Sequence, residues 1–211
     1  MDQNSFIHQF NTAVARGLPG EQSHAALMPI NRPFSSDARM NTEEYRQSAV
    51  GIVLFNAGES IRCVLIQRPH YDGVHGNQIS FPGGKRDTTD SNLEFTARRE
   101  CMEEISLKTE LMTTVGILTE VFIPISKFLI QPYVFFVEKM PQLIPDQREV
   151  REIFTFDIHD LLKDNTLKSM DMRFDNDRIQ KNVPYFSIEE RVVWGATAMI
   201  LSELKAIIKM F

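Results

Sequence analysis

The sequence predicts an α/β fold of the α+β kind, in which helices cover both faces of a mixed β-sheet. Two observations support this prediction: β-rich runs alternate with segments of helical periodicity, and 43% of the 211 residues are hydrophobic. A chain of this length and composition can bury one sizeable core. We therefore expect a single domain over residues 1–211, in which residues 1–40 form an N-terminal helix and a connector packed on the core.

The first predicted element is an amphipathic helix over 5–16, followed by a connector over 17–33 that contains several turn residues. Residues 49–56 and 62–67 are β-rich, and the Ala-Gly-Glu-Ser segment between them predicts a hairpin. Two further strands are predicted at 111–119 and 130–138. Two further helices are predicted at 157–163 and 189–209.

A helix is predicted from about residue 91 to residue 105. Ser91 and Glu94 have the spacing of a capping box, and an apolar residue recurs at every fourth position. The apolar positions are Leu93, Ala97, Cys101 and Ile105. At about 100° per residue, this stripe places Glu100 and Glu104 one above the other.

Three carboxylates therefore share one flank of this helix, because Glu103 lies close to Glu100 and Glu104. Arg99 is four residues before Glu103 and can pair with it. The like-charged pair of Glu100 and Glu104 costs roughly 0.2 to 0.5 kcal/mol in an isolated helix. A hard cation would reverse that cost, because Mg²⁺ prefers oxygen ligands. The helix predicts either a metal site or an ordinary solvated face.

A glycine turn precedes the acidic helix, in the Phe-Pro-Gly-Gly-Lys-Arg-Asp segment at 81–87. Pro82 restricts φ, whereas Gly83 and Gly84 allow backbone conformations that are closed to other residues. The chain can therefore turn sharply and present backbone groups to an ion or a phosphate. The combination of this turn with the acidic helix favours a metal site for cleaving a diphosphate.

Segment 84–107 resembles the Nudix box, whose pattern is G-x5-E-x7-R-E-U-x-E-E-x-G-U, where U is a bulky aliphatic residue. The matching positions are Gly84, Arg99, Glu100, Met102, Glu103, Glu104 and Leu107. The loop is one residue longer than the pattern, so Ser91 occupies the position of the first acid and Asp90 precedes it. Ser106 replaces the late glycine, which predicts a weaker left-handed helix terminus.

The longer loop is similar to that of the Nudix subfamily that hydrolyses coenzyme A, and the resemblance extends over about residues 24–205. Segments 64–69 and 78–84 match part of the upstream signature of that subfamily. Asn77 stands where the signature has a glycine. The second signature arginine has no clear counterpart, although His75 is nearby.

The resemblance implies an α/β/α sandwich and hydrolysis that depends on Mg²⁺ or Mn²⁺. The implied reaction cleaves the diphosphate of coenzyme A or acyl-coenzyme A to 3′,5′-ADP and (acyl-)4′-phosphopantetheine. One alternative is a Nudix hydrolase of another nucleoside diphosphate conjugate, such as ADP-ribose or NADH. A different class is a Nudix-like module that binds a nucleotide without cleaving it.

The resemblance and the residue types together give the candidate site residues. Glu100 and Glu104 would bind the metal, Glu103 would be a further ligand or a nearby acid, and Arg99 would support them. The candidate substrate-binding residues are Arg68, His75, Gly83, Gly84 and Lys85. Glu149 or Glu120 would be the general base or an extra metal ligand, with Glu149 preferred because it lies in a predicted loop.

The composition indicates the remaining properties. A net charge of −5 gives no basic surface for nucleic acid. The two cysteines are expected to be buried thiols, and neither a signal pattern nor a membrane-length apolar run is present. We expect a cytoplasmic enzyme with a small-molecule substrate. The oligomeric state stays open, with a homodimer as one alternative.

Overall fold

The computed structural model describes residues 3–29, 32–40, 44–69, 77–173 and 179–211. Its main sheet has eight strands, and the strand bounds are β1 (Arg46–Ala57), β2 (Ser60–Gln67), β3 (Ile79–Ser80), β4 (Gly83–Lys85), β5 (Thr113–Ile117), β6 (Val121–Ile123), β7 (Phe128–Val137) and β8 (Glu152–Asp157). The order is β3-β2-β1-β7-β5, with β4 beside β1, β6 beside β7 and β8 beside β2. Because β1 and β7 are parallel and the other pairs are antiparallel, the sheet is mixed, as predicted.

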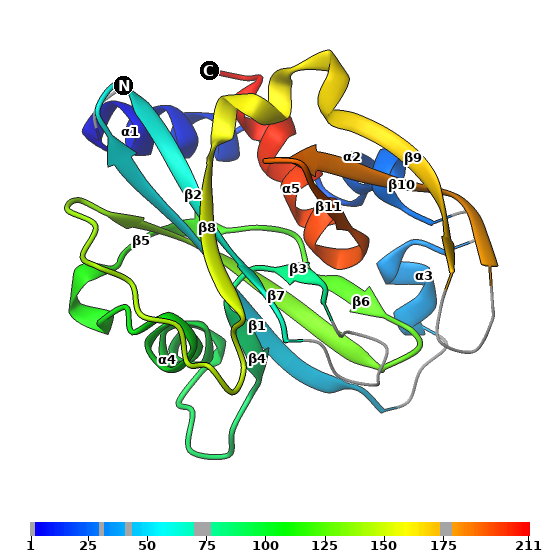
Figure 1. Cartoon of the computed structure of the whole chain (residues 1–211), viewed down its shortest axis with the longest axis horizontal. Coiled ribbons are helices and arrows are strands. Elements are labelled where there is room, and N and C mark those ends of the chain that lie inside the picture. Colours follow the sequence, from blue (N-terminus) through cyan, green and yellow to red (C-terminus); the bar gives the residue numbers. More distant parts are fainter. Residues whose placement is uncertain (1–2, 30–31, 41–43, 70–76, 174–178) are drawn as a thin grey trace.

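Helices cover both faces of this sheet (Figure 1). Helix α4 (Leu93–Ile105) lies on one face, and α1 (Gln3–Val14) and α5 (Gly195–Ile208) lie on the other. The alternation of side chains along β1 explains this arrangement, because Ile52 points toward α5 and Val53 points toward α4. The predicted α/β/α sandwich is confirmed.

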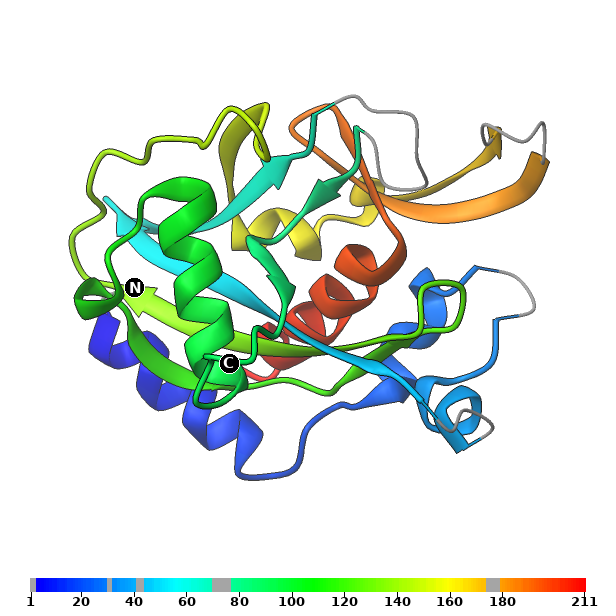
Figure 2. The same ribbon diagram turned by 90° about the horizontal axis from the view of Figure 1, so that it is seen from below.

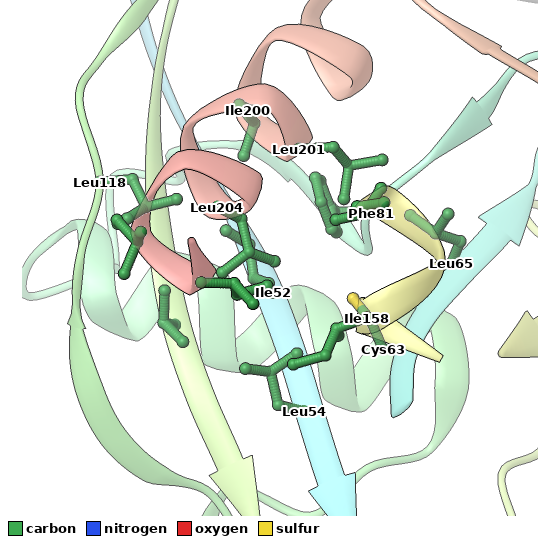
Figure 3. Packing of buried hydrophobic residues seen from close by; sticks show 14 of the residues in the cluster. Ile52, Leu54, Cys63, Leu65, Phe81, Leu118, Ile158, Ile200, Leu201 and Leu204 are labelled. Atoms are coloured by element: carbon green, nitrogen blue, oxygen red, sulfur yellow. The ribbon is translucent and has the colours of Figure 1, made fainter. Parts of the chain in front are cut away.

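The larger core lies between the sheet and α5. Figure 3 shows Leu201 and Leu204 of α5 above Ile52 and Leu54 of β1. The N-terminal helix α1 joins the same core through Phe6 and Phe10, which are fully buried. Each buried side chain of this size stabilises the fold by about 1.5 to 3 kcal/mol. The N-terminal helix therefore packs on the core. It begins and ends two residues earlier than the predicted range 5–16.

Helix α4 lies close to the sheet because β1 has a glycine beneath it. A Cβ atom at Gly51 would lie only 2.6 Å from Sγ of Cys101, which is buried on α4. Ala97, Cys101 and Ile105 are all completely buried, which confirms the predicted apolar stripe. Gly51 thus sets the distance between the sheet and the helix that holds the carboxylates.

A second, three-stranded antiparallel sheet follows β8, and the sequence analysis predicted none of its strands. It contains β9 (Leu167–Arg173), β10 (Ile179–Ile188) and β11 (Arg191–Trp194). Figure 2 shows β9 and β10 extending away from the main body. The predicted helix over 189–209 is wrong at its start, because 191–194 is a strand and α5 begins at Gly195.

The other differences from the predicted elements are smaller. The N-terminal connector contains short helices, namely α2 (Glu21–His24), η1 (Ala25–Leu27) and, after it, α3 (Ser35–Met40). The predicted strand at 111–119 is shorter, because η2 (Thr109–Leu111) precedes β5. The predicted helix at 157–163 is a 3₁₀ helix, η3 (Ile158–Leu162), and η4 (Asp164–Thr166) follows it. In the described part of the chain, no helix has the length and apolar character needed to cross a membrane.

Candidate metal and diphosphate site

The acidic helix α4 begins at a different cap from the predicted one. Asn92 is the N-cap residue, and its side chain accepts a hydrogen bond from Phe95 N at 2.8 Å. The predicted capping box of Ser91 and Glu94 is therefore wrong, because the helix starts one residue later than such a box requires. Glu94 instead accepts hydrogen bonds from Arg98 and from the Thr114 hydroxyl.

The end of α4 keeps a left-handed residue despite the missing glycine. Ser106 has φ 56° and ψ 29°, and its backbone N–H bonds to Met102 O at 3.1 Å. Its hydroxyl also donates to Ile144 O at 3.0 Å. The Ser106 substitution therefore does not remove the helix terminus, because these hydrogen bonds help to hold the residue in a conformation that a Cβ disfavours.

Three glutamates converge beside α4. Ligand oxygens of Glu100, Glu104 and Glu149 all lie within 4.8 Å of one another. Glu100 and Glu104 are buried, at 8% and 1% exposure, whereas Glu149 is exposed at the rim. The loop that contains Glu149 is attached to the helix by a backbone bond from Asp146 N to Glu104 O at 3.0 Å.

The glycine turn forms the opposite wall of this site. Gly83 N donates a hydrogen bond to Glu104 Oε2 at 2.8 Å. A Cβ at Gly83 would lie 2.5 Å from Ala49 O, and a Cβ at Gly84 would collide with the Glu100 carboxylate. Both glycines are therefore needed for close packing, at Gly83 against β1 and at Gly84 against α4.

Burial makes the carboxylates of this site costly to ionise. Burial raises the pKa of Glu104 to about 8, against the opposing effects of the Gly83 N–H and the Arg68 guanidinium. Burial also raises the pKa of Glu100, although Arg99 opposes it. A divalent cation would supply the missing positive charge, and carboxylate oxygens are the ligands that Mg²⁺ and Mn²⁺ prefer. The donor set therefore fits such an ion.

Arg99 connects the carboxylates to the preceding loop. Its Nη1 donates to Glu100 Oε1 at 2.9 Å and to Glu103 Oε2 at 2.8 Å. The predicted Arg99–Glu103 pair is thus confirmed, and Glu103 is held on the exposed flank of α4. Arg99 Nη2 also donates to Lys85 O at 3.1 Å.

Asp90 is a site residue that the sequence analysis missed. Its carboxylate, only 3% exposed, accepts hydrogen bonds from Arg99 Nε at 2.9 Å and Nη2 at 3.0 Å. Thr96 Oγ1 and Asp87 N also donate to it. Its pair with Arg99 lowers the pKa of Asp90 to about 2. Asp90 thus holds the Arg99 side chain in place. The sequence contained one sign of this role, because Asp90 is next to Ser91, which occupies the position of the missing acid in the Nudix pattern.

The other predicted residues lie at different distances from the three glutamates. Arg68 Nη2 is 3.6 Å from Glu104 Oε1 and 3.4 Å from Gly83 O. Lys85 follows the glycine turn and is exposed. Glu120 is not part of the glutamate group, because it forms an ion pair with Arg39 at 2.8 Å. His75 lies outside the described residues.

Comparisons with known proteins identify the family to which this chain belongs. Two curated relatives are both named uncharacterized Nudix hydrolase NudL. The protein from Pectobacterium atrosepticum is 28% identical over 130 residues, which is 62% of this chain and 66% of that protein. The protein from Yersinia pestis (strain Pestoides F) is 28% identical over 141 residues, which is 67% of this chain and 69% of that protein. The chain thus spans about two thirds of these relatives.

The comparison of structures agrees at the level of the fold. A MutT/nudix family protein from Enterococcus faecalis has a TM-score of 0.51 and 15% identity. The match covers 80% of this chain and 64% of that one. The model of the NUDIX domain matches residues 45–174, which is more than half of the sequence and includes the glycine turn, α4 and Glu149. The chain therefore belongs to the Nudix family.

Proposed function

We propose that the protein hydrolyses the diphosphate bond of coenzyme A or acyl-coenzyme A in the presence of Mg²⁺ or Mn²⁺. The products would be 3′,5′-ADP and (acyl-)4′-phosphopantetheine. The convergence of Glu100, Glu104 and Glu149 is the observation that supports hydrolysis. The long loop of the Nudix box and the upstream segment that contains Arg68 support coenzyme A as the substrate.

Each residue of the site has a role in this proposal. Glu100, Glu104 and Glu149 would hold the metal ion, which when bound lowers the pKa of water and neutralises charge on the diphosphate. Glu149 is exposed at the rim, so its carboxylate is the candidate to accept a proton from the attacking water. Arg68 binds a phosphate oxygen of the substrate. Arg99 holds Glu100 and Glu103, and Gly83 N–H orients Glu104.

Two alternative functions differ from this one in the substrate or in the absence of turnover. A second enzyme function keeps the same chemistry but acts on ADP-ribose or NADH. A third is a nucleotide-binding module without turnover, which the intact Glu100, Glu103 and Glu104 disfavour. Two buried free thiols in an acidic chain support a reducing compartment, so we propose the cytoplasm as its location.

The test combines a substrate panel with two matched variants of α4. Coenzyme A, dephospho-coenzyme A, ADP-ribose and NADH are incubated at one metal concentration, and the products are separated chromatographically. Glu104→Gln should lower kcat by at least a hundredfold, because the lost charge acts in the transition state. Glu94→Gln on the same helix should change kcat less than threefold, because Glu94 contacts Arg98 and Thr114.

The two parts of the proposal can fail separately. If Glu104→Gln retains normal turnover at saturating metal, the assignment of the metal site is wrong. If ADP-ribose or NADH is cleaved with the highest kcat/KM, the substrate assignment is wrong while the metal site stands. If no compound in the panel is cleaved but nucleotides bind, the non-catalytic function is favoured.

A further inference from the structure

Most arginines near the three glutamates already have carboxylate partners. Arg99 donates to Asp90, Glu100 and Glu103. Arg148 forms an ion pair with Asp146 at 2.6 Å. Within the described ranges, Arg151 forms no ion pair with any carboxylate, and the partner of its Nη1 is the neutral Asn77 Oδ1 at 3.3 Å. Among the described residues, Arg151 is thus a cation without a carboxylate partner.

The position of Arg151 brings its side chain to the end of strand β2. Strand β2 lies between β8 and β3, and Arg151 immediately precedes β8. Its backbone N–H donates to Gln67 O at 2.8 Å, which is the residue before Arg68. Since Asn77 lies on the β3 side of β2, the Arg151 side chain crosses the strand end where Arg68 also begins.

Two guanidinium groups at one strand end repel each other unless an anion lies near them. The Glu104 carboxylate is 3.6 Å from the Arg68 guanidinium, so it neutralises the charge of Arg68 only in part. The Arg68 side chain also remains about one third exposed. Arg151 is exposed, so both groups can reach a ligand. The planar guanidinium matches the oxygens of a phosphate with two parallel hydrogen bonds. A phosphate group therefore complements this pair better than a neutral ligand does.

We propose that Arg68 and Arg151 form a guanidinium pair that binds two different phosphates of the substrate. Arg68 contacts Gly83 O and Glu104, so it serves the diphosphate that is cleaved. Arg151 begins on the β8 side of β2, contacts no carboxylate of the described residues, and binds a phosphomonoester elsewhere on the nucleotide. Arg151 thereby determines the preference for a 3′-phosphorylated nucleotide. This inference rests on the proposed function, because it names the residue that recognises the 3′-phosphate of coenzyme A.

The first experiment compares coenzyme A with dephospho-coenzyme A in the wild type, Arg151→Gln and the control Arg148→Gln. Loss of one charge-assisted contact corresponds to roughly a tenfold to hundredfold loss of kcat/KM. Arg151→Gln should show this loss for coenzyme A, mainly through KM, and less than threefold for dephospho-coenzyme A. Arg148→Gln removes a neighbouring positive charge and should leave both values within threefold. Arg151→Lys should recover part of the loss.

The second experiment separates this inference from the proposed function, because it needs no turnover. Calorimetry measures the binding of 3′,5′-ADP and of 5′-AMP to the wild type and to Arg151→Gln. The wild type should bind 3′,5′-ADP at least tenfold more tightly than 5′-AMP, and Arg151→Gln should bind both about equally. That result supports the role of Arg151 even if coenzyme A is not cleaved. An equal loss for both nucleotides, or no loss for either, overturns it.

Discussion

Replacement of Asp90 by asparagine tests how the loop before α4 holds Arg99 in place. The Asp90 carboxylate accepts four hydrogen bonds: three at Oδ2, from Arg99 Nη2, Asp87 N and Thr96 Oγ1, and one at Oδ1, from Arg99 Nε. An asparagine amide can keep its oxygen at the position of the three donors. Its NH₂ group then faces the Nε–H of Arg99, so one charge-assisted bond is lost and two donors oppose each other.

The magnitude follows from these lost contacts. A hydrogen bond to a charged group contributes about 1.5 to 3 kcal/mol, and a buried donor without a partner costs about 1 to 3 kcal/mol. Arg99 retains Glu100 and Glu103, which partly offsets the loss. We therefore expect Asp90→Asn to lower the free energy of unfolding by about 3 kcal/mol. Because Arg99 then orients Glu100 less well, kcat should fall at least tenfold.

The assay is urea denaturation followed by fluorescence, together with kcat at saturating metal. Asp87→Asn is the control, because Asp87 is exposed and accepts its hydrogen bonds from Thr88 and Thr89. The contribution of Asp90 has a defined pH range, since its folded pKa is lowered to about 2. It should be complete above about pH 4 and decline as the pH falls toward 2. If Asp90→Asn lowers the free energy of unfolding by less than about 0.5 kcal/mol at pH 7, this role of Asp90 is wrong.

Three further outcomes are expected. Gly84→Ala should raise the metal concentration for half-maximal activity at least tenfold, because its Cβ would displace the Glu100 carboxylate; an unchanged titration contradicts this. Because burial raises the pKa of Glu104 to about 8, a proton competes with the metal below that pH. The Mn²⁺ affinity measured by calorimetry should therefore rise about tenfold per pH unit from pH 6 to 7.5, and a flat profile would exclude the competition. Glu203→Gln should lower the free energy of unfolding in urea by about 2 to 4 kcal/mol, since fully buried Glu203 accepts bonds from Thr119 N and Oγ1; equal stability would exclude this.

The helix that holds the carboxylates could be predicted because its signal is local. The four-residue recurrence of Ala97, Cys101 and Ile105 follows from the helix period alone, and all three are buried. The same period places Glu100 and Glu104 on one flank. Glu149 was chosen from its predicted loop, and the structure brings it to the other two glutamates.

The elements that sequence analysis missed depend on contacts that leave little local signal. Glu189 and Glu190 both have positive φ, at 47° and 60°, and form the turn between β10 and β11. Turns with positive φ usually contain glycine or asparagine, and this one contains neither. In the sequence, the two glutamates therefore resemble the start of a helix. Asp90 was missed for a similar reason, because its partner Arg99 is nine residues away and on another element.

The parallel pairing of β1 with β7 makes the assembly of the candidate site depend on contacts between distant parts of the sequence. From Arg46 with Phe128 to Phe55 with Val137, the paired residues lie roughly 80 positions apart in the sequence, and such long-range pairings form slowly. Strand β4 reaches its place only along β1, and the Glu149 loop joins α4 from farther along the chain. The three glutamates should therefore come together only when the sheet is complete, and not when α4 alone has formed.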